Sequence, residues 1–404
     1  MIFAFYIFAA LLIFLSYRSF RGGIAYYNFF KSELSKPVSS YTPFATVIAP
    51  CKGMDEGLED NLSALFAQDY PEYEVIFVVD SENDPAVGVM ESVSEKNFAS
   101  SRLCGKPFRK IVVAPRTTDS SQKVENLREA VLHADERTEV FVFVDSDARV
   151  SSEWLRRLVA PLEDDSVGAS TGYRWFISEP MTIAAELRSA WNASIASALG
   201  PKLESNFCWG GSMAIRRVTF DQINMRERWR GTLSDDFAVT RAMKDACLSI
   251  VHVPQALVPS FGSCSMHELF EFTNRQMKIT RVNAQHLWLL SYFGSTVFIG
   301  VMTTSILLAL LSTGFSRWAG VFTFLVVSLF SVGKSWLRLA AVNLVLADRW
   351  PQVKQQGLSQ NTLWLITPFV FLVNCISATM SRRVTWRGIK YELKSPNETV
   401  IVTD

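Results

Sequence analysis

The residues best suited to chemistry are the two aspartates of Asp145-Ser146-Asp147, which directly follow the apolar run FVFV. Two carboxylates on one turn offer the oxygen ligands that hard cations such as Mg²⁺ or Mn²⁺ prefer. A cation held there could bridge a diphosphate whose charge grows as its bond to carbon breaks. Aspartate and serine are also common in turns and at helix N-termini, so the stretch could simply cap the next helix.

A second acidic pair, Asp235-Asp236, stands in GTLSDDFAVTRAMK, where helical spacing begins. One acid is enough to cap a helix and to interact with its dipole, and this structural role remains open. Two adjacent acids exceed that need. If an acceptor hydroxyl must lose its proton as it attacks, one carboxylate within hydrogen-bond reach is the minimum requirement.

Basic residues at two places could face such acids. Lys278 and Arg281 lie three apart in an amphipathic stretch, so they share a helix face and could clamp a leaving diphosphate. They could equally be juxtamembrane charges attracted to anionic lipid. Lys123 and Asn126 in SQKVENL lie near a predicted strand end, or on a solvated helix face. Gly210-Gly211 could let the backbone approach a ligand closely.

The elements that must position these residues alternate in type. Apolar runs at 45–49, 74–79, 109–114 and 139–144 are separated by helical patterns at 57–68, 86–96 and 121–133. Near-continuous apolar strands are typical of strands buried on both faces. The pattern therefore predicts an α/β, Rossmann-like fold with a mostly parallel sheet covered by helices.

In such sheets a ligand binds beyond the carboxyl ends of the strands. Lys52 follows the first predicted strand, Asp80 the second and Asp145 the fourth, so three of four strand ends deliver a charge to one edge. No GxGxxG follows the first strand and no GxxxxGK[ST] occurs, which disfavours a dinucleotide fold and a P-loop.

Composition narrows the class of protein. Of 404 residues 49% are hydrophobic and 20% charged, which indicates that part of the chain lies in lipid. The balance of 40 Lys and Arg against 39 Asp and Glu provides no overall basic field for nucleic acid. The cysteines form no CxxC pair and lie near no His at metal-ligand spacing, so we expect reduced, mostly packed thiols. They are Cys51, Cys104, Cys208, Cys247, Cys264 and Cys375.

The apolar excess is concentrated at the two ends of the chain. Residues 1–22 contain an uncharged run followed by Arg18 and Arg21, which predicts a membrane anchor with the next segment in the cytoplasm. A cleaved signal peptide is the alternative, but a basic residue before the run and a small-x-small site after it are missing. We expect a soluble domain at 40–265 and an amphipathic helix along the membrane surface at 266–286.

Residues 287–381 hold three further spanning-length runs, at 287–312, 318–333 and 363–380. We expect two to three C-terminal membrane helices, followed by a basic, cytoplasmic-type tail at 382–404. Three full crossings would place that tail outside, against the positive-inside tendency. One run is therefore expected to be re-entrant or interfacial, with 339–346 or part of 318–338 as candidates.

Several stretches together resemble the inverting glycosyltransferases of family two with a GT-A fold, in the ceramide glucosyltransferase-like branch with its bacterial lipid-glycosylating relatives. The resemblance covers nearly the whole chain. It is carried by PCKGMDEGLEDNLSALFAQDYPEYEVIFVVDSENDPA (50–86), SQKVENL, VDSDARV (144–150), SDDFAVTRAM (234–243), KITRV (278–282) and VTWRGIKYEL (384–393).

The resemblance implies roles for the acidic residues. Asp80 is expected to contact the uridine of a UDP-sugar, Asp145 and Asp147 to handle the ribose and the metal-diphosphate, and Asp236 to act as the general base. The family's last signature, Gln or Arg followed three later by Arg-Trp, falls on Lys278, Arg281 and Val282. Because Val282 lacks the aromatic platform of Trp, a processive polysaccharide synthase is less expected.

The resulting expectation is a membrane-bound enzyme that moves a hexose from a UDP-hexose donor to the hydroxyl of a membrane lipid such as ceramide or diacylglycerol. It would act by one inverting displacement with Mg²⁺ or Mn²⁺, with Lys52, Lys123 and Asp235 as further substrate-binding residues. A bacterial inner membrane with a cytoplasmic catalytic domain is expected. Two alternatives stay open: a polyprenyl-phosphate sugar transferase, and an inactive membrane scaffold that only binds nucleotide-sugar.

Overall fold

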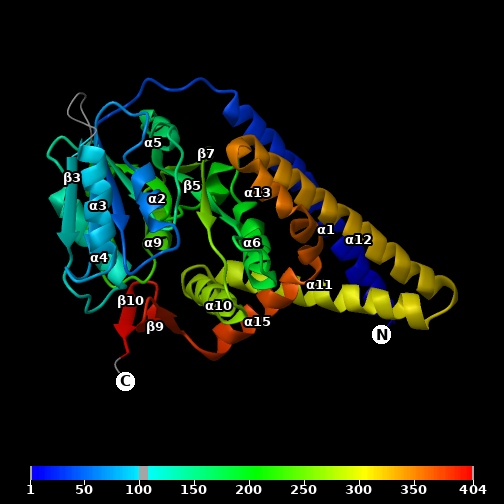
Figure 1. Ribbon diagram of the computed structural model, residues 1–404. Helices are drawn as coiled ribbons and strands as arrows, with labels where there is room; N and C mark the ends of the chain where they lie inside the picture. The colour runs from blue at the N-terminus through cyan, green and yellow to red at the C-terminus, as the bar shows by residue number, and fades with distance from the viewer. Residues whose placement is uncertain (1, 100–107, 403–404) are drawn as a thin grey trace. The chain divides into compact units, whose positions relative to one another are not determined.

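The computed structural model describes residues 2–99 and 108–402 and divides into two compact units. One unit, termed the sheet unit, comprises residues 33–176, 198–262 and 382–404. The other, termed the helical unit, comprises residues 1–32, 177–197 and 263–381. Residues 177–197 were expected within the 40–265 domain, and they belong to the helical unit. Figure 1 shows the elements of both units along the chain.

The sheet unit is built on a seven-stranded sheet with the order β3-β2-β1-β4-β6-β5-β7. The first four predicted strands are confirmed to within one residue at each end, and β3, β2, β1 and β4 pair in parallel. Strand β6 is antiparallel to both β4 and β5. The strands are β1 Ala45–Pro50, β2 Tyr73–Val79, β3 Phe108–Val113, β4 Val140–Val144, β5 Val167–Ile177, β6 Ser212–Arg216 and β7 Ser249–Phe261.

Helices bury the apolar side chains of this sheet. Alternate strand residues such as Ile48, Ile76 and Phe143 share a core with Val124 and Val239, which come from two helices of the unit. Ile76 and Val78 of β2 face this core, so Phe77 between them points to the other face of the sheet. There it packs edge-on against Phe66, with ring centroids 5.9 Å apart. The sheet is therefore covered on both faces, which is why its strands read as continuous apolar runs.

The three predicted helical patterns are confirmed as α2, α3 and α4 with its following 3-10 turn, although α2 ends four residues earlier than the pattern suggested because the chain continues in turns from Leu65. The helices of the sheet unit are α2 Leu58–Ala64, α3 Ala86–Ala99, α4 Gln122–Ala130, α5 Trp154–Val159, α7 Arg217–Gln222, α8 Met225–Arg228 and α9 Asp235–Asp245, with 3-10 turns η1 Val131–His133, η2 Ala160–Glu163 and η3 Leu203–Ser205.

The segment 382–404, expected as a tail, instead forms an antiparallel sheet of β8 Arg383–Trp386, β9 Ile389–Ser395 and β10 Glu398–Ile401. The turn between β8 and β9 places Arg387 and Gly388 at positive φ, as tight hairpin turns require. The buried hydroxyl of Tyr391 accepts a hydrogen bond of 3.1 Å from the backbone N–H of Gln122. The basic composition of this segment suggested an exposed tail. The structure instead buries alternate residues of β9, as in a strand with one covered face.

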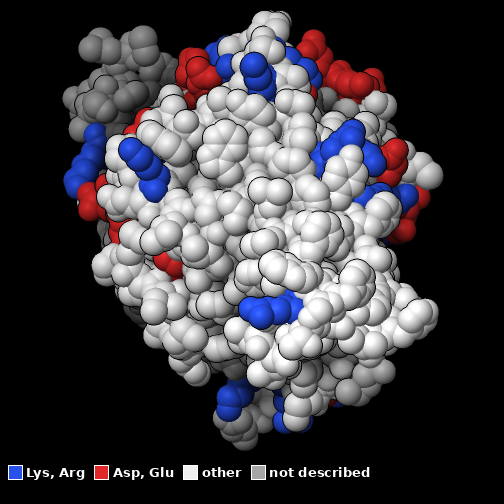
Figure 2. All heavy atoms as spheres, turned by 90° about the vertical axis from the view of Figure 1, so that its right-hand side faces the viewer, with Lys and Arg blue, Asp and Glu red and all other residues white. Residues whose placement is uncertain are grey.

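The helical unit contains the helices of membrane-spanning character. Three of its helices are long and apolar enough to cross a membrane, namely α1 Ile2–Leu34, α11 Gln285–Leu311 and α12 Gly314–Val345. Figure 2 faces the side of Figure 1 where α11 and α12 meet; the middle of this view is nearly free of charged side chains, which gather toward its rim. The other helical elements are α6 Ile183–Ala196, α10 Met266–Asn283, η4 Ala347–Arg349, α13 Trp350–Gln355, α14 Gly357–Thr362, η5 Leu363–Leu365 and α15 Thr367–Met380.

One run was expected to be re-entrant or interfacial, with 339–346 or part of 318–338 as candidates. Helix α12 runs without a break from Gly314 to Val345, so the structure shows no bend at either candidate. The helical pair that is bent, by 57°, is instead 357–365 with Thr367–Met380, and it counts as a fourth candidate span if it crosses as one. Pro368 lies at the start of its second half, where a residue without an N–H is tolerated.

The amphipathic stretch before the first C-terminal span is confirmed as a helix. Helix α10 begins with a capping box, in which Ser265 and Glu268 each bond the backbone of the other. Of the cysteines, Cys51, Cys208, Cys264 and Cys375 are buried free thiols and Cys247 is an exposed one. Cys104 lies outside the described residues.

We predict that Tyr391→Phe destabilises the sheet unit, because the buried N–H of Gln122 loses its acceptor, at a cost of about 1–3 kcal/mol. Thermal unfolding of the purified chain should show a lower midpoint. Tyr27→Phe is the control, since no hydrogen bond of Tyr27 is found within 2–99 and 108–402. Equal midpoints for the two variants would mean that the C-terminal sheet does not support α4.

Candidate active site

The carboxyl end of β4 carries Asp145 and Asp147, and the structure joins them to Asp235 of α9 through Lys123 and Arg174. The Nζ of Lys123, on α4, lies 2.7 Å from Oδ1 of Asp145 and 3.2 Å from Oδ1 of Asp235 at the start of α9. Asp147 joins the group through Arg174 of β5, whose Nη atoms lie 2.8 Å from Oδ2 of Asp145 and 2.9 Å from Oδ2 of Asp147. We call these five residues the carboxylate cluster.

Arg174 was not anticipated from the sequence, although it is a charge within the apolar strand GYRWF. Because β6 is antiparallel to both neighbours, β5 runs in the same direction as β4. Residue 174 lies three positions beyond Thr171, the last residue of β5 that pairs with β6, and so reaches the edge where β4 ends. The rule that strand ends gather at one edge could have found it if β5 had been recognised.

Burial and charge set the protonation of the cluster. Burial raises the pKa of Asp235 to about 6, and the nearby carboxylates act in the same direction, while Lys123 opposes them. For Asp145, burial alone would raise the pKa, but the cations Lys123 and Arg174 outweigh it and the net direction is downward. Burial likewise works against the charge of Lys123, yet the carboxylates keep its pKa above the usual value.

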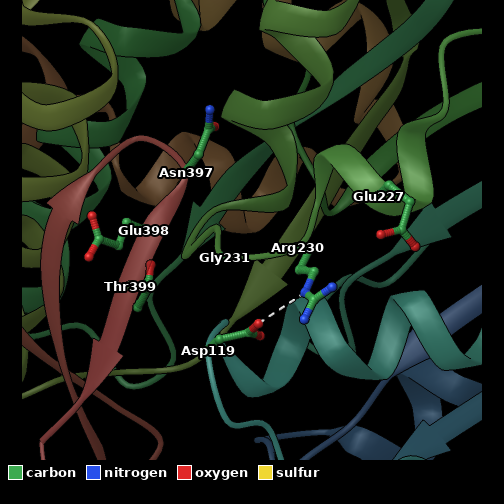
Figure 3. A pocket seen from close by; sticks show the side chains of 7 residues that line it. All are labelled: Asp119, Glu227, Arg230, Gly231, Asn397, Glu398 and Thr399. Carbon is green, nitrogen blue, oxygen red and sulfur yellow. Dashed lines mark hydrogen bonds and ion pairs between the residues drawn. The ribbon is translucent and has the colours of Figure 1, made fainter.

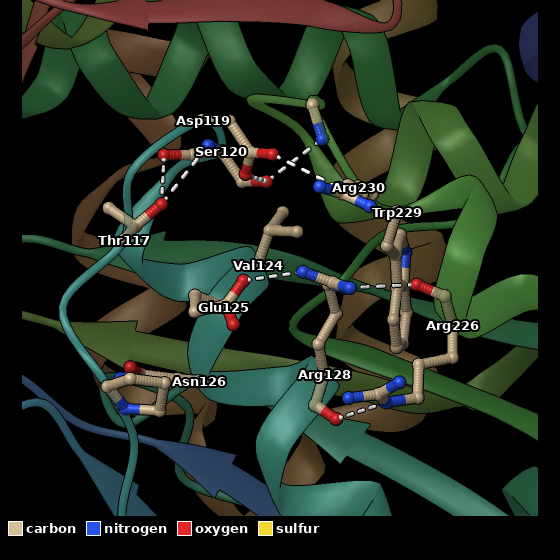
Figure 4. A network of polar contacts seen from close by, with 12 residues as sticks. Thr117, Asp119, Ser120, Val124, Glu125, Asn126, Arg128, Arg226, Trp229 and Arg230 are labelled. Atoms are coloured by element: carbon tan, nitrogen blue, oxygen red, sulfur yellow. Dashed lines mark hydrogen bonds and ion pairs between the residues drawn. The ribbon is translucent and has the colours of Figure 1, made fainter.

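Helix α4, which carries Lys123, is held by a polar network (Figure 4). Arg128 and Arg226 each donate from Nε to the backbone carbonyl of the other, at 3.1 and 3.0 Å. Arg128 also pairs with Glu125 at 2.7 Å. In the loop before α4, the hydroxyl of Ser120 accepts a 2.9 Å hydrogen bond from the N–H of Gly231. The network thus ties α4 to the segment that leads into α9.

Two glycines allow the cluster to close. A Cβ added to Gly210 would lie 2.0 Å from Oδ2 of Asp235, and one added to Gly211 would lie 2.2 Å from Cζ2 of Trp209 and 2.6 Å from Oδ2 of Asp145. The sequence suggested that the backbone at Gly210-Gly211 could lie close to a ligand. In the structure this backbone lies close to carboxylates of the cluster itself. Only glycine leaves room for them at these positions.

The remaining predicted residues fall into separate groups. At the ends of β1 and β2, Lys52 and Asp80 form an ion pair with each other. Asp236 follows Asp235 and is half-buried, and its Oδ1 accepts hydrogen bonds from the hydroxyl of Ser234 and, at 2.7 Å, from its neighbour's N–H.

Lys278 and Arg281 lie on α10 of the helical unit. Arg281 donates to the carbonyl oxygens of Ala378 and Thr379 at the end of α15 and lies 5.3 Å over the ring of Trp288. These contacts give Arg281 a role in holding α10 against α11 and α15, which the sequence did not suggest.

Asp55 is a further residue that the sequence reasoning did not select. Its carboxylate accepts a 2.5 Å hydrogen bond from the hydroxyl of Ser146, between the two aspartates of the turn. The same carboxylate pairs with Arg387 in the β8–β9 turn. The loop after β1, the acidic turn and the C-terminal sheet are thus connected.

The oxygen donors fit a divalent cation. Oδ1 of Asp147 is buried without a hydrogen-bond partner among the described residues, and a buried carboxylate oxygen is a hard ligand that calls for a cation. No group of three or more His, Cys, Asp or Glu side chains suited to a metal occurs within 2–99 and 108–402. The protein would therefore hold an ion by the pair Asp145 and Asp147.

A shallow pocket elsewhere in the sheet unit shares no lining residue with the cluster (Figure 3). It lies between β10 and the end of α8, and its walls carry both signs of charge, with Arg230 paired to Asp119 at 3.2 Å. Its lining residues are Asp119, Glu227, Arg230, Gly231, Asn397, Glu398 and Thr399. This mixture does not point to a nucleotide-sugar.

A family model described as "Glycosyl transferase family 21" matches residues 11–399. The chain belongs to this family. Ceramide glucosyltransferase of Komagataella phaffii is 42% identical over 79 residues, which are 18% of this chain and 16% of that protein. Ceramide glucosyltransferase of Gibberella zeae is 27% identical over 186 residues, which are 42% of this chain and 34% of that protein. The alignments thus span about a third or less of these relatives.

Solved structures of glycosyltransferases are also similar. A mannosyltransferase from Pyrobaculum calidifontis in complex with GDP-Man and Mn²⁺ is 18% identical with a TM-score of 0.45, over 92% of this chain and 98% of that chain. Glucosyl-3-phosphoglycerate synthase from Mycobacterium tuberculosis with Mn²⁺ and UDP-glucose is 13% identical with a TM-score of 0.36, over 60% and 79%.

The ceramide glucosyltransferase-like resemblance is thereby confirmed, and the matching family is numbered 21 rather than two. The α/β fold with its mostly parallel sheet is confirmed as well. The three candidate spans of this family member support a membrane protein.

We predict that Gly210→Ala disturbs the cluster, because a Cβ 2.0 Å from Oδ2 of Asp235 and 3.0 Å from Nζ of Lys123 must displace one of them. Overpacking of this kind costs about 1–3 kcal/mol, which thermal unfolding detects. Gly200→Ala is the matched control, since no atom lies within 4 Å of its added Cβ. A Gly210→Ala midpoint as high as that of Gly200→Ala would contradict the described packing.

Proposed function

We propose that this protein transfers a hexose from a UDP-sugar to the hydroxyl group of a membrane lipid, with inversion at the anomeric carbon. The observation that carries the proposal is the convergence of Asp145, Asp147 and Asp235 on two cations at the edge where β4 ends. Membership of glycosyl transferase family 21 and the ceramide glucosyltransferase relatives support a lipid acceptor.

In the proposed reaction the carboxylate of Asp236 accepts the proton of the acceptor hydroxyl as its oxygen attacks the anomeric carbon and the bond to UDP breaks. Ser234 and the backbone N–H after Asp236 bond one carboxylate oxygen, Oδ1. These bonds orient the group. Asp235 beside it is paired with Lys123 and serves to hold that lysine rather than to take the proton.

The donor side of the proposal uses the other charges of this edge. Asp80 and Lys52 at the ends of neighbouring strands are proposed to contact the uridine part. Asp145 and Asp147 would hold Mg²⁺ or Mn²⁺, which supplies positive charge to a departing diphosphate. Lys278 and Arg281 lie on α10 of the helical unit, and a contribution of their charge to donor binding stays an expectation of the family resemblance.

The spans of the helical unit support a lipid acceptor on physical grounds. Withdrawing a two-tailed lipid from the bilayer costs about 0.8 kcal/mol for each exposed CH₂. An enzyme that acts on such a lipid therefore has to work at the membrane surface, and α10 with its amphipathic pattern precedes the first C-terminal span. A bacterial inner membrane with the sheet unit on the cytoplasmic side is our proposed location.

We predict that Asp236→Asn lowers kcat for lipid glycosylation by about 10²-fold or more, the usual contribution of a general base. Binding of UDP, measured by titration calorimetry, should stay close to that of the unaltered chain. Asp245→Asn at the far end of α9 is the control, since this residue pairs with Arg228 on the surface. Full activity of Asp236→Asn would remove Asp236 as the base.

The acceptor class can be read from the product. Purified membranes supplied with labelled UDP-hexose should yield a lipid whose label survives mild acid, because a glycoside of a hydroxyl is more stable than a sugar phosphate. Release of the label by mild acid would favour the polyprenyl-phosphate transferase instead. Donor binding without turnover across a panel of UDP-hexoses and lipids would favour the inactive scaffold.

A further inference from the structure

The acidic turn already holds a cation that belongs to the protein. The guanidinium of Arg174 takes Oδ2 of Asp145 and Oδ2 of Asp147, at 2.8 and 2.9 Å. Lys123 takes the other oxygen of Asp145 at 2.7 Å. Both oxygens of Asp145 are therefore paired, and one positive group bridges the two carboxylates that a divalent ion would share.

One oxygen of the pair remains available to an incoming ion. Oδ1 of Asp147 is buried and has no hydrogen-bond partner among the described residues. An ion that binds there meets, on the second carboxylate, oxygens that Lys123 and Arg174 already bond, so its charge competes with theirs. Arg174 is the group in the way because it bonds Asp147 as well as Asp145.

Arg174 has a support that does not depend on the carboxylates. Its guanidinium lies 4.7 Å from the ring centroid of Trp209 and 5.2 Å from that of Phe176, within the range of cation–π attraction. Trp209 packs in turn against Tyr173 at 5.5 Å. A guanidinium released from the turn can stay near it on these rings, with its side chain only 12% exposed.

The chemistry of arginine suits both positions. Its planar fork can join two oxygens of separate carboxylates, and the same fork bonds phosphate oxygens. We propose that Arg174 is the resident counter-cation of the acidic turn: it neutralises Asp145 and Asp147 before a donor binds, competes with the divalent ion for their oxygens, and then bonds the donor's diphosphate. The inference rests on the proposed function, because it assigns the site to a nucleotide diphosphate.

The test measures Mn²⁺ binding to the full chain in detergent without donor or acceptor, from the loss of the free-ion signal in electron paramagnetic resonance. Arg174→Gln should bind Mn²⁺ about 10-fold more tightly than the unaltered chain, since a competing charge is gone. Arg174→Lys keeps the charge without the fork and should fall between them. Arg137→Gln is the matched control, because Arg137 also stacks on a ring, Phe44, and pairs with surface carboxylates.

The donor arm uses UDP. With saturating Mn²⁺, Arg174→Gln should bind UDP about 10-fold more weakly than the unaltered chain, whereas Arg137→Gln should not differ. Unchanged or weaker Mn²⁺ binding by Arg174→Gln overturns the competition, and so does the absence of Mn²⁺ binding in all four proteins. Unchanged UDP binding overturns the transfer to the diphosphate. Sugar transfer by the unaltered chain is measured separately, so failure of this inference is distinguishable from failure of the proposed function.

Discussion

The structure of the site depends on the need to neutralise carboxylates that lie close together and away from water. Asp145, Asp147 and Asp235 repel one another, and burial adds to the cost of their charges. Lys123 and Arg174 supply positive charge within the cluster, and Arg387 acts on Asp145 and Asp147 from the C-terminal sheet. Burial is the main reason that the pKa of Asp235 is raised to about 6.

The elements of the sheet unit place Lys123 and Arg174 at the acidic turn. Lys123 is held there because α4 is bonded to the segment before α9 and, through the N–H of Gln122, to the C-terminal sheet. Arg174 is held there because β5 runs beside β6 in the direction of β4. The charge at the turn therefore depends on segments distant in the chain, and the C-terminal sheet is the farthest of them.

The helical unit adds the second requirement of the proposed reaction, an acceptor that stays in lipid. Its spans expose apolar side chains over most of their length, as expected of surfaces that face hydrocarbon. Arg281 bonds the end of α15 and stacks on Trp288 of α11, so the basic residues before the spans also have a structural task. Arg281 in this basic stretch therefore helps to hold helices of the unit together, a role separate from any attraction to anionic lipid.

The sequence by itself determined the strands and helices of the first half of the sheet unit, the membrane-spanning stretches and the acids Asp145, Asp147 and Asp235. Those features depend on local periodicity and on residue chemistry, which neighbours in the chain reveal. The roles of Arg174, Asp55 and Arg387, the fold of residues 382–404 and the bend near Pro368 were decided only by tertiary structure. Each depends on which distant segments pair or pack, and a pairing of remote strands leaves no periodic signal in either strand alone.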